Sequence, residues 1–132
     1  MGNLSWFLSF CLSLTPITIE SIGSDCFHNP ELMGQYEAKT ETITLCENNI
    51  TLSKYSKEEV VKHELIHYIY HKHQIESIIP EPLITWLVRK NIPSDQVMYV
   101  ILNEDKYSSN EEFSARLLQK LPSLIIGIGI IL

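Results

Sequence analysis

The residues with the clearest chemical potential lie in one short segment, His63-Glu64-Leu65-Ile66-His67, which has the pattern H-E-x-x-H. In a helix, residues four apart lie on one face, so His63 and His67 can present their imidazoles to the same point. Two imidazoles at one point are two of the ligands that Zn²⁺ takes in proteins. Glu64 follows the first histidine, where its carboxylate can reach a metal-bound water without binding the metal itself. The spacing therefore predicts a zinc site with a general base beside it.

The sequence around this motif predicts the helix that the motif needs. Ser56 and Glu59 form a capping box directly before an apolar run, and no Gly or Pro interrupts residues 57–79. We expect a helix from about Lys57 to the mid-seventies. The helix has too many apolar residues to be fully exposed, so we expect most of it to be buried. These residues are Val60, Val61, Leu65, Ile66 and Ile69, with Tyr68 and Tyr70 as packing residues.

Two histidines on the same helix are the first alternatives for the third metal ligand. His73 occupies the last position of the longer pattern H-E-x-x-H-x-x-G-x-x-H, but Tyr70 stands where that pattern has the Gly that turns the chain back. On a continuing helix, His73 points away from the face that carries His63 and His67. His71 stays on the correct face but lies a further turn along, so we expect it beside the site or in solvent.

The third alternative lies downstream, in residues 110–116, which begin another predicted helix. Ser109 and Glu112 form a second capping box there. Ala115 follows Glu112 by three residues, and a small residue lets two helices approach closely enough for a carboxylate on one to reach a metal on the other. Glu111 is the competitor, since it lies nearer the apolar stripe, and either acid also suits the first turn of a helix. We favour Glu112 as the ligand on the pattern E-x-x-A.

H-E-L-I-H followed by a separate helix with E-x-x-A resembles the gluzincin class of zinc metallopeptidases. Residues 43–50 and 60–67 resemble the small metalloprotease of the mitochondrial intermembrane space, and residues 112–115 are similar to the catalytic domain of anthrax lethal factor. The resemblance covers residues 34–121. This chain departs from the mitochondrial type in one respect, because that enzyme brings its third ligand from much nearer the H-E-L-I-H motif.

The resemblance implies a zinc-dependent peptidase that hydrolyses peptide bonds of a peptide or protein substrate. Zn²⁺ held by His63, His67 and Glu112 would lower the pKa of a bound water toward ~7. Glu64 would take the proton of that water and deliver it to the leaving amine. Tyr107 resembles the tyrosine with which lethal-factor-like enzymes stabilise the oxyanion, and an ordinary loop aromatic is the alternative. The other function in view is a non-proteolytic binding or regulatory module with a zincin fold, which would have no use for the general base.

The segment before the active helix predicts strands, so we expect an α+β, zincin-like fold in one domain over residues 1–132. Strands are expected at residues 15–22, 35–37 and 42–46, the last two joined by a hairpin turn. They would form a small mixed or antiparallel sheet lobe packed on the active-site helix. By the resemblance, the strand just before that helix is the sheet edge, where an extended substrate adds as a further strand.

The second half of the chain predicts a helical part. Helices are expected at residues 83–90, 95–102 and 110–120, and a strand is the alternative for the middle segment. No internal repeat and no long Gly/Ser linker marks a second domain.

Charge and cysteine content narrow the function classes. The net charge of -6, without a stripe of Lys or Arg, argues against nonspecific nucleic-acid binding. Cys26 and Cys46 could pair in an oxidising compartment, but we favour free buried thiols for the cysteines of this chain.

The two ends of the chain allow several interpretations. Residues 4–14 are apolar and fit a packed first helix; a signal-like segment is the alternative, although no Lys or Arg precedes it and no A-x-A follows. Residues 124–132 form an apolar tail, too short to span a membrane, which takes ~20 residues. A buried strand and a membrane-surface tail both fit it, so membrane association is one of the alternatives for this end.

Overall fold

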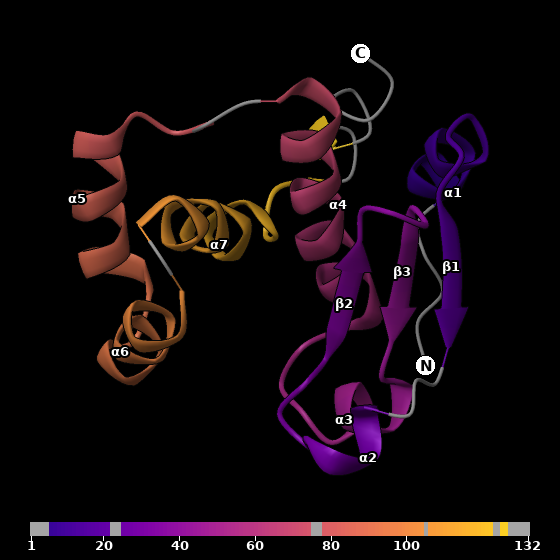
Figure 1. The fold of residues 1–132 in the computed structure, drawn as a ribbon, viewed down its shortest axis with the longest axis horizontal. Helices are drawn as coiled ribbons and strands as arrows, with labels where there is room; N and C mark the ends of the chain where they lie inside the picture. Colours follow the sequence, from indigo (N-terminus) through magenta and orange to yellow (C-terminus); the bar gives the residue numbers. More distant parts are fainter. Residues whose placement is uncertain (1–5, 22–24, 75–77, 105, 123–124, 127–132) are drawn as a thin grey trace.

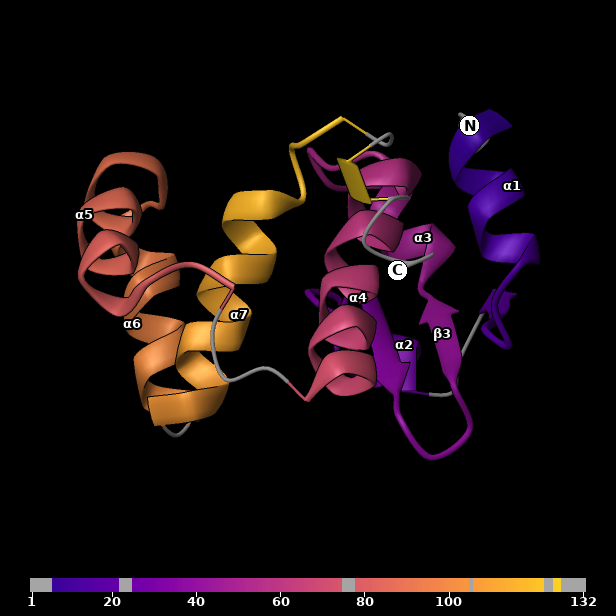
Figure 2. The ribbon, with the colours of Figure 1, turned by 90° about the horizontal axis from the view of Figure 1, so that it is seen from above.

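The computed structural model describes residues 6–21, 25–74, 78–104, 106–122 and 125–126. Helix α4 (Lys57–His73) lies at the centre of the molecule, with a three-stranded sheet on one side and helix α7 (Lys106–Leu118) on the other (Figure 1). Helices α5 (Glu81–Asn91) and α6 (Ser94–Asn103) pack on the far side of α7, as the second view shows (Figure 2). The expected α+β class, with a small sheet lobe and a helical C-terminal part, is confirmed at this level.

The sheet consists of β1 (Thr18–Ser21), β2 (Gly34–Glu37) and β3 (Thr42–Leu45), in the order β1-β3-β2. Strand β1 pairs with β3 in parallel, and β2 pairs with β3 as an antiparallel hairpin. The expectation that β3 forms the edge is therefore wrong: β3 is the central strand, and β2 lies at the edge. The reason is that β1, from much earlier in the chain, pairs with the side of β3 that the hairpin leaves open.

Helix α4 has the bounds that its sequence predicts. The hydroxyl of Ser56 accepts a hydrogen bond from the backbone N–H of Glu59 at 3.1 Å, which caps the first turn. The helix ends at His73, where Gln74 takes a left-handed conformation with φ of 52°. Val61 and Leu65 are fully buried, so the expected burial of this helix is confirmed.

The C-terminal part is helical, and residues 95–102 belong to helix α6 rather than to a strand. The predicted start of the last helix is wrong. Helix α7 begins at Lys106, so Ser109 lies within it and its hydroxyl donates to the carbonyl of Glu104 at 3.5 Å instead of capping the helix. Neither Gly nor Pro stands between residues 106 and 109, so nothing in the sequence stops the helix from starting earlier.

Two apolar cores hold these layers together. The first lies between the sheet, α4 and helix α1 (Trp6–Ser13), where Leu8 is fully buried, as expected for a packed first helix. Ile126, from the short described part of the apolar tail, belongs to this core, and the rest of the tail lies outside the described residues. The second core joins α5, α6 and α7. Among the described residues, no helix has the length and apolar character of a membrane span.

A disulfide joins Cys26 to Cys46, with their Cα atoms 5.6 Å apart. The preference for free thiols at these two positions is therefore wrong. Two short helices bring the cysteines together: Cys26 lies in α2 (Asp25–His28), and Cys46 precedes the first residue of α3 (Glu47–Thr51). Their separation of 20 residues gave no indication of this contact. Cys11 is free and buried, as expected.

Candidate metal centre

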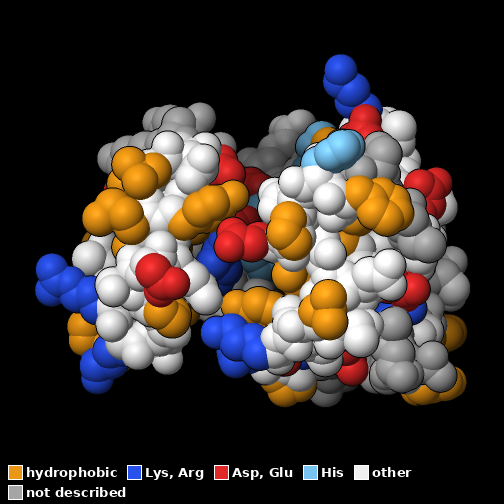
Figure 3. All heavy atoms as spheres, turned by 90° about the horizontal axis from the view of Figure 1, so that it is seen from below, with side chains coloured by type: hydrophobic (Ala, Val, Ile, Leu, Met, Phe, Trp, Pro, Cys, Tyr) orange, Lys and Arg blue, Asp and Glu red, His pale blue; other side chains and the backbone are white. Residues whose placement is uncertain are grey.

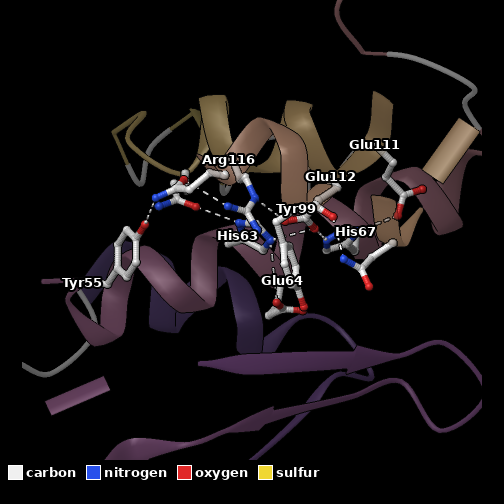
Figure 4. A network of polar contacts seen from close by, with 11 residues as sticks. Tyr55, His63, Glu64, His67, Tyr99, Glu111, Glu112 and Arg116 are labelled. Atoms are coloured by element: carbon white, nitrogen blue, oxygen red, sulfur yellow. Dashed lines mark hydrogen bonds and ion pairs between the residues drawn. The ribbon is translucent and has the colours of Figure 1, made fainter. Parts of the chain in front are cut away.

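Helices α4 and α7 cross at the point where the H-E-x-x-H motif faces the second helix (Figure 4). His63 and His67 lie one turn apart on α4, with their ring centroids 5.3 Å apart. Glu112 projects from α7 toward both rings. Ala115 is fully buried in the core that contains α4, so a small residue stands where the helices approach each other.

Three side chains converge in this crossing. The Oε1 atom of Glu112 lies 3.2 Å from Nε2 of His63 and 3.1 Å from Nε2 of His67. One donor atom from each of the three residues lies within 4.8 Å of the other two. Their side chains are only 16, 19 and 18% exposed for His63, His67 and Glu112. Two imidazole nitrogens and one carboxylate oxygen form a donor set that fits Zn²⁺.

The other ring nitrogen of each histidine has its own partner. Nδ1 of His63 lies 2.7 Å from Oε1 of Gln119, and Nδ1 of His67 lies 2.5 Å from Oε2 of Glu111. Because both partners present oxygen atoms, Nδ1–H is the donor in each pair. This arrangement fixes the orientation of both rings and directs Nε2 toward Glu112, as is usual for metal-binding histidines.

Glu111, the competing candidate for the third metal ligand, is not one of the three converging side chains. It contacts the outer nitrogen of His67 rather than joining the three converging side chains. Sequence reasoning missed Gln119 altogether, because it is 56 positions from His63 and belongs to no motif. Only its position two helical turns beyond Glu112, which puts both residues on the same side of the segment, could have suggested it.

Without metal, the converging groups act as an ion cluster. Burial lowers the pKa of His67, but its hydrogen bonds with Glu111 and Glu112 outweigh this effect and raise the pKa to about 10. Burial likewise opposes the contact of His63 with Glu112, and the net pKa of His63 is raised. Burial raises the pKa of Glu112, but the two histidines hold it well below its usual range. A metal ion that binds here must therefore displace protons.

Glu64 lies on the side of α4 that faces the sheet. It is separate from His63, His67 and Glu112, which we call the converging trio. Its side chain is only 8% exposed, and its Oε1 atom is 4.0 Å from Nε2 of His63. Burial is the largest influence on this carboxyl and raises its pKa, and the neighbouring histidines oppose that rise. The backbone of Tyr36, in strand β2, has a smaller effect that lowers this pKa. Glu64 thus lies between the candidate ligands and strand β2.

A cavity of about 530 Å³ lies beside these groups. Strand β2 lines it with Gly34, Gln35 and Tyr36, and α4 lines it with Glu64, His67, Tyr70 and His71. On the face shown in Figure 3, the surface is hollowed between helices α5 and α6 and the rest of the molecule, with acidic side chains at the hollow. Glu64, His67 and Glu112 all line this cavity, so it opens directly onto the base candidate and onto two of the three converging side chains.

The remaining candidates have simpler surroundings. His71 is exposed and lines the cavity, and His73 is exposed at the end of α4; neither belongs to the converging trio. The hydroxyl of Tyr70 donates to Ser114 at 2.9 Å and accepts from the backbone N–H of Ile78, which agrees with a packing role. Tyr107 belongs to α7, but its side chain lies outside the described residues, so its expected role stays a prediction.

No protein-family model, curated protein or solved structure matches this chain at a significant level. The resemblance to gluzincins and the zincin-like fold therefore stay predictions made from the motifs.

Proposed function

We propose that this protein is a zinc-dependent peptidase in which His63, His67 and Glu112 hold the metal. The observation that supports this proposal is the convergence of three donor atoms within 4.8 Å from two helices that are far apart in the sequence. When bound, zinc would activate a water molecule and polarise the carbonyl of the scissile peptide bond. Peptide hydrolysis is the reaction for which the neighbouring groups are suited.

Glu64 is the residue that separates a peptidase from a simple metal-binding module. It is buried next to the candidate ligands, but its carboxylate is not one of the three converging donors. In the proposed reaction, Glu64 accepts a proton from the attacking water and passes it to the amine of the leaving group. Its raised pKa suits this exchange, because a base with a pKa closer to neutrality also serves as an acid.

Strand β2 provides a place for the substrate main chain. It is one of the two edge strands of the described sheet, and it lines the cavity next to Glu64. An extended peptide would pair with the outer side of β2 as an additional strand, with its backbone held beside the catalytic groups. This placement replaces β3, which the sheet order excludes as an edge.

The test begins with the zinc content of protein purified without added metal, measured by elemental analysis after dialysis. We expect about one zinc per chain. Cleavage of a mixed peptide library by the wild type and by Glu64→Gln is then measured by mass spectrometry. Glu64→Gln should retain the zinc and lose about 10²–10⁴-fold in rate. Glu58→Gln, the same substitution in the first turn of α4, should behave as the wild type.

Each result has a distinct meaning. Protein that contains no zinc and takes up none on titration would refute the proposal. Full cleavage by Glu64→Gln would remove Glu64 as the general base. One zinc per chain without cleavage by the wild type would favour the non-proteolytic binding module.

A further inference from the structure

We propose that Arg116 is a positioning residue. Its hydrogen bond to one oxygen of Glu112 leaves only the other oxygen of this carboxylate to bind the metal. The inference rests on the proposed function, because it concerns the same metal centre. It assigns a role to a residue that no motif of the sequence includes.

The two oxygens of Glu112 have separate partners. Oε1 faces the Nε2 atoms of His63 and His67 at 3.2 and 3.1 Å. Oε2 points the other way and accepts a hydrogen bond from Nε of Arg116 at 2.7 Å. A short hydrogen bond from a permanently charged guanidinium holds Oε2 firmly. One carboxylate oxygen, Oε1, therefore faces the metal centre, and the other, Oε2, binds the arginine.

Arg116 is itself held from the opposite side. Its Nη1 donates to Oε1 of Gln96 in α6 at 3.1 Å. Nε2 of Gln96 in turn donates to the hydroxyl of Tyr55, which precedes α4, at 3.4 Å. Figure 4 shows this row of contacts running from Tyr55 through Arg116 to Glu112. The guanidinium thus has fixed partners in addition to the carboxylate.

An ordinary i,i+4 ion pair on a helix surface is the simpler interpretation of Arg116 and Glu112. Such a pair stabilises a helix by only ~0.3–0.5 kcal/mol. Here the side chains are only 23 and 18% exposed, and Glu112 is the one carboxylate in the converging trio. The ion pair with Arg116 therefore does more than a surface pair would. By holding Oε2, it fixes the orientation in which Oε1 of Glu112 faces the histidines.

The chemical consequence concerns the number of bonds to the metal. A carboxylate can bind a metal ion through one oxygen or through both. Catalytic zinc sites use three protein ligands and keep a further position open for water or substrate. By occupying Oε2, Arg116 keeps Glu112 from filling that position with its second oxygen. The guanidinium suits this task because it stays charged at every physiological pH.

The experiment replaces Arg116 by Gln and loads the protein with Co²⁺ in place of zinc. Arg89→Gln is the matched control, because Arg89 is the other arginine of the chain and lies in α5. In Arg116→Gln we expect one metal ion per chain and a loss of visible Co²⁺ absorption, as the coordination number rises above four. X-ray absorption of the zinc form should show an additional oxygen neighbour. Arg89→Gln should keep the wild-type spectrum, and Arg116→Lys should restore it only in part.

The outcomes separate this inference from the proposed function. A wild type that binds neither metal would refute the metal centre and the role of Arg116 together. A wild type that binds metal, with an unchanged spectrum in Arg116→Gln, would overturn the role of Arg116 alone. If Arg116→Gln does not fold, Gln96→Ala serves in its place, because it removes a partner of the guanidinium. Gln96→Ala should then show the same spectral loss in weaker form, and an unchanged spectrum would overturn the inference.

Discussion

At the scale of single residues, the proposed metal centre implies that protons and zinc would compete for the same histidine nitrogen atoms. The contacts of His67 with Glu111 and Glu112 raise its pKa to about 10 after the opposing effect of burial. At neutral pH, the metal-free protein therefore carries a protonated His67 between two carboxylates. Zinc binding must release that proton, so the apparent affinity for zinc depends on pH.

We expect the apparent zinc affinity to rise with pH, about tenfold per pH unit for each proton displaced, up to about pH 10. Competition with a chelator of known affinity at several pH values measures this slope. His71→Asn, which changes a histidine outside the converging trio, should leave the slope unchanged. An affinity that does not vary between pH 6 and pH 8 would contradict the proposed competition.

The same groups determine how the stability of the metal-free protein varies with pH. The raised pKa of His67 stabilises the fold fully below its ordinary value of 6.5, and this contribution is lost as the pH rises toward about 10. The lowered pKa of Glu112 stabilises the fold above its ordinary value of 4.5, and this contribution is lost at lower pH. Urea unfolding of the metal-free protein should therefore show the largest contribution from this cluster between about pH 4.5 and 6.5.

At the scale of elements, strand β2 and helix α4 meet at Gly34. A Cβ atom at this position would lie 2.9 Å from Cγ1 of Val60 and 3.2 Å from the backbone carbonyl oxygen of Thr44. It would also lie 3.5 Å from Cγ of Glu64. The absence of a side chain at Gly34 therefore allows strand β2 to approach the helix that carries Glu64, the proposed general base.

Gly34→Ala should lower the free energy of unfolding by about 1–3 kcal/mol, because the added methyl group overfills this contact. Denaturant unfolding measures the change. The double variant Gly34→Ala/Val60→Ala removes the clash with Val60. Its free energy of unfolding should therefore fall by less than the sum of the decreases in the two single variants. Zinc content should stay the same in Gly34→Ala, since the three converging side chains come from α4 and α7. A single variant as stable as the wild type would show that β2 is free to move away from α4.

At the scale of the whole molecule, the disulfide and one asparagine hold the segment between α2 and β2. The disulfide fixes Cys26 to the start of α3. The side-chain nitrogen of Asn49 lies 2.8 Å from the carbonyl oxygen of Leu32 and 3.1 Å from that of Asn29. In Figure 1 these short helices lie at one end of the sheet, and α7 lies on the far side of α4.

Reduction of the disulfide should lower the free energy of unfolding by about 3 kcal/mol, as expected for a closed loop of this length. Denaturant unfolding with and without a reductant measures the loss. The double variant Cys26→Ser/Cys46→Ser should show a similar loss and no further effect of the reductant. Zinc content should be retained, because Asn49 still holds the segment and the candidate ligands lie in α4 and α7. Equal stability of the oxidised and reduced protein would contradict a stabilising role for the disulfide.

The local features of this protein could be read from its sequence. The capped helix α4, the one-turn spacing of His63 and His67, and the hairpin of β2 and β3 each depend on residues only a few positions apart. Because such interactions form within one helix or between strands that follow each other directly, pattern and spacing were sufficient to predict them. The preference for Glu112 over Glu111 came from a motif as well, and the structure places Glu112 opposite the two histidines.

Tertiary structure decided everything that depends on which elements meet. The central position of β3 and the pairing of Cys26 with Cys46 follow from packing between segments that no local pattern connects. Gln119 reaches His63 across 56 positions, and Arg116 meets Gln96 across 20. These contacts exist because buried apolar faces bring α4, α6 and α7 together, and the polar groups in between must then find partners where the packing leaves them.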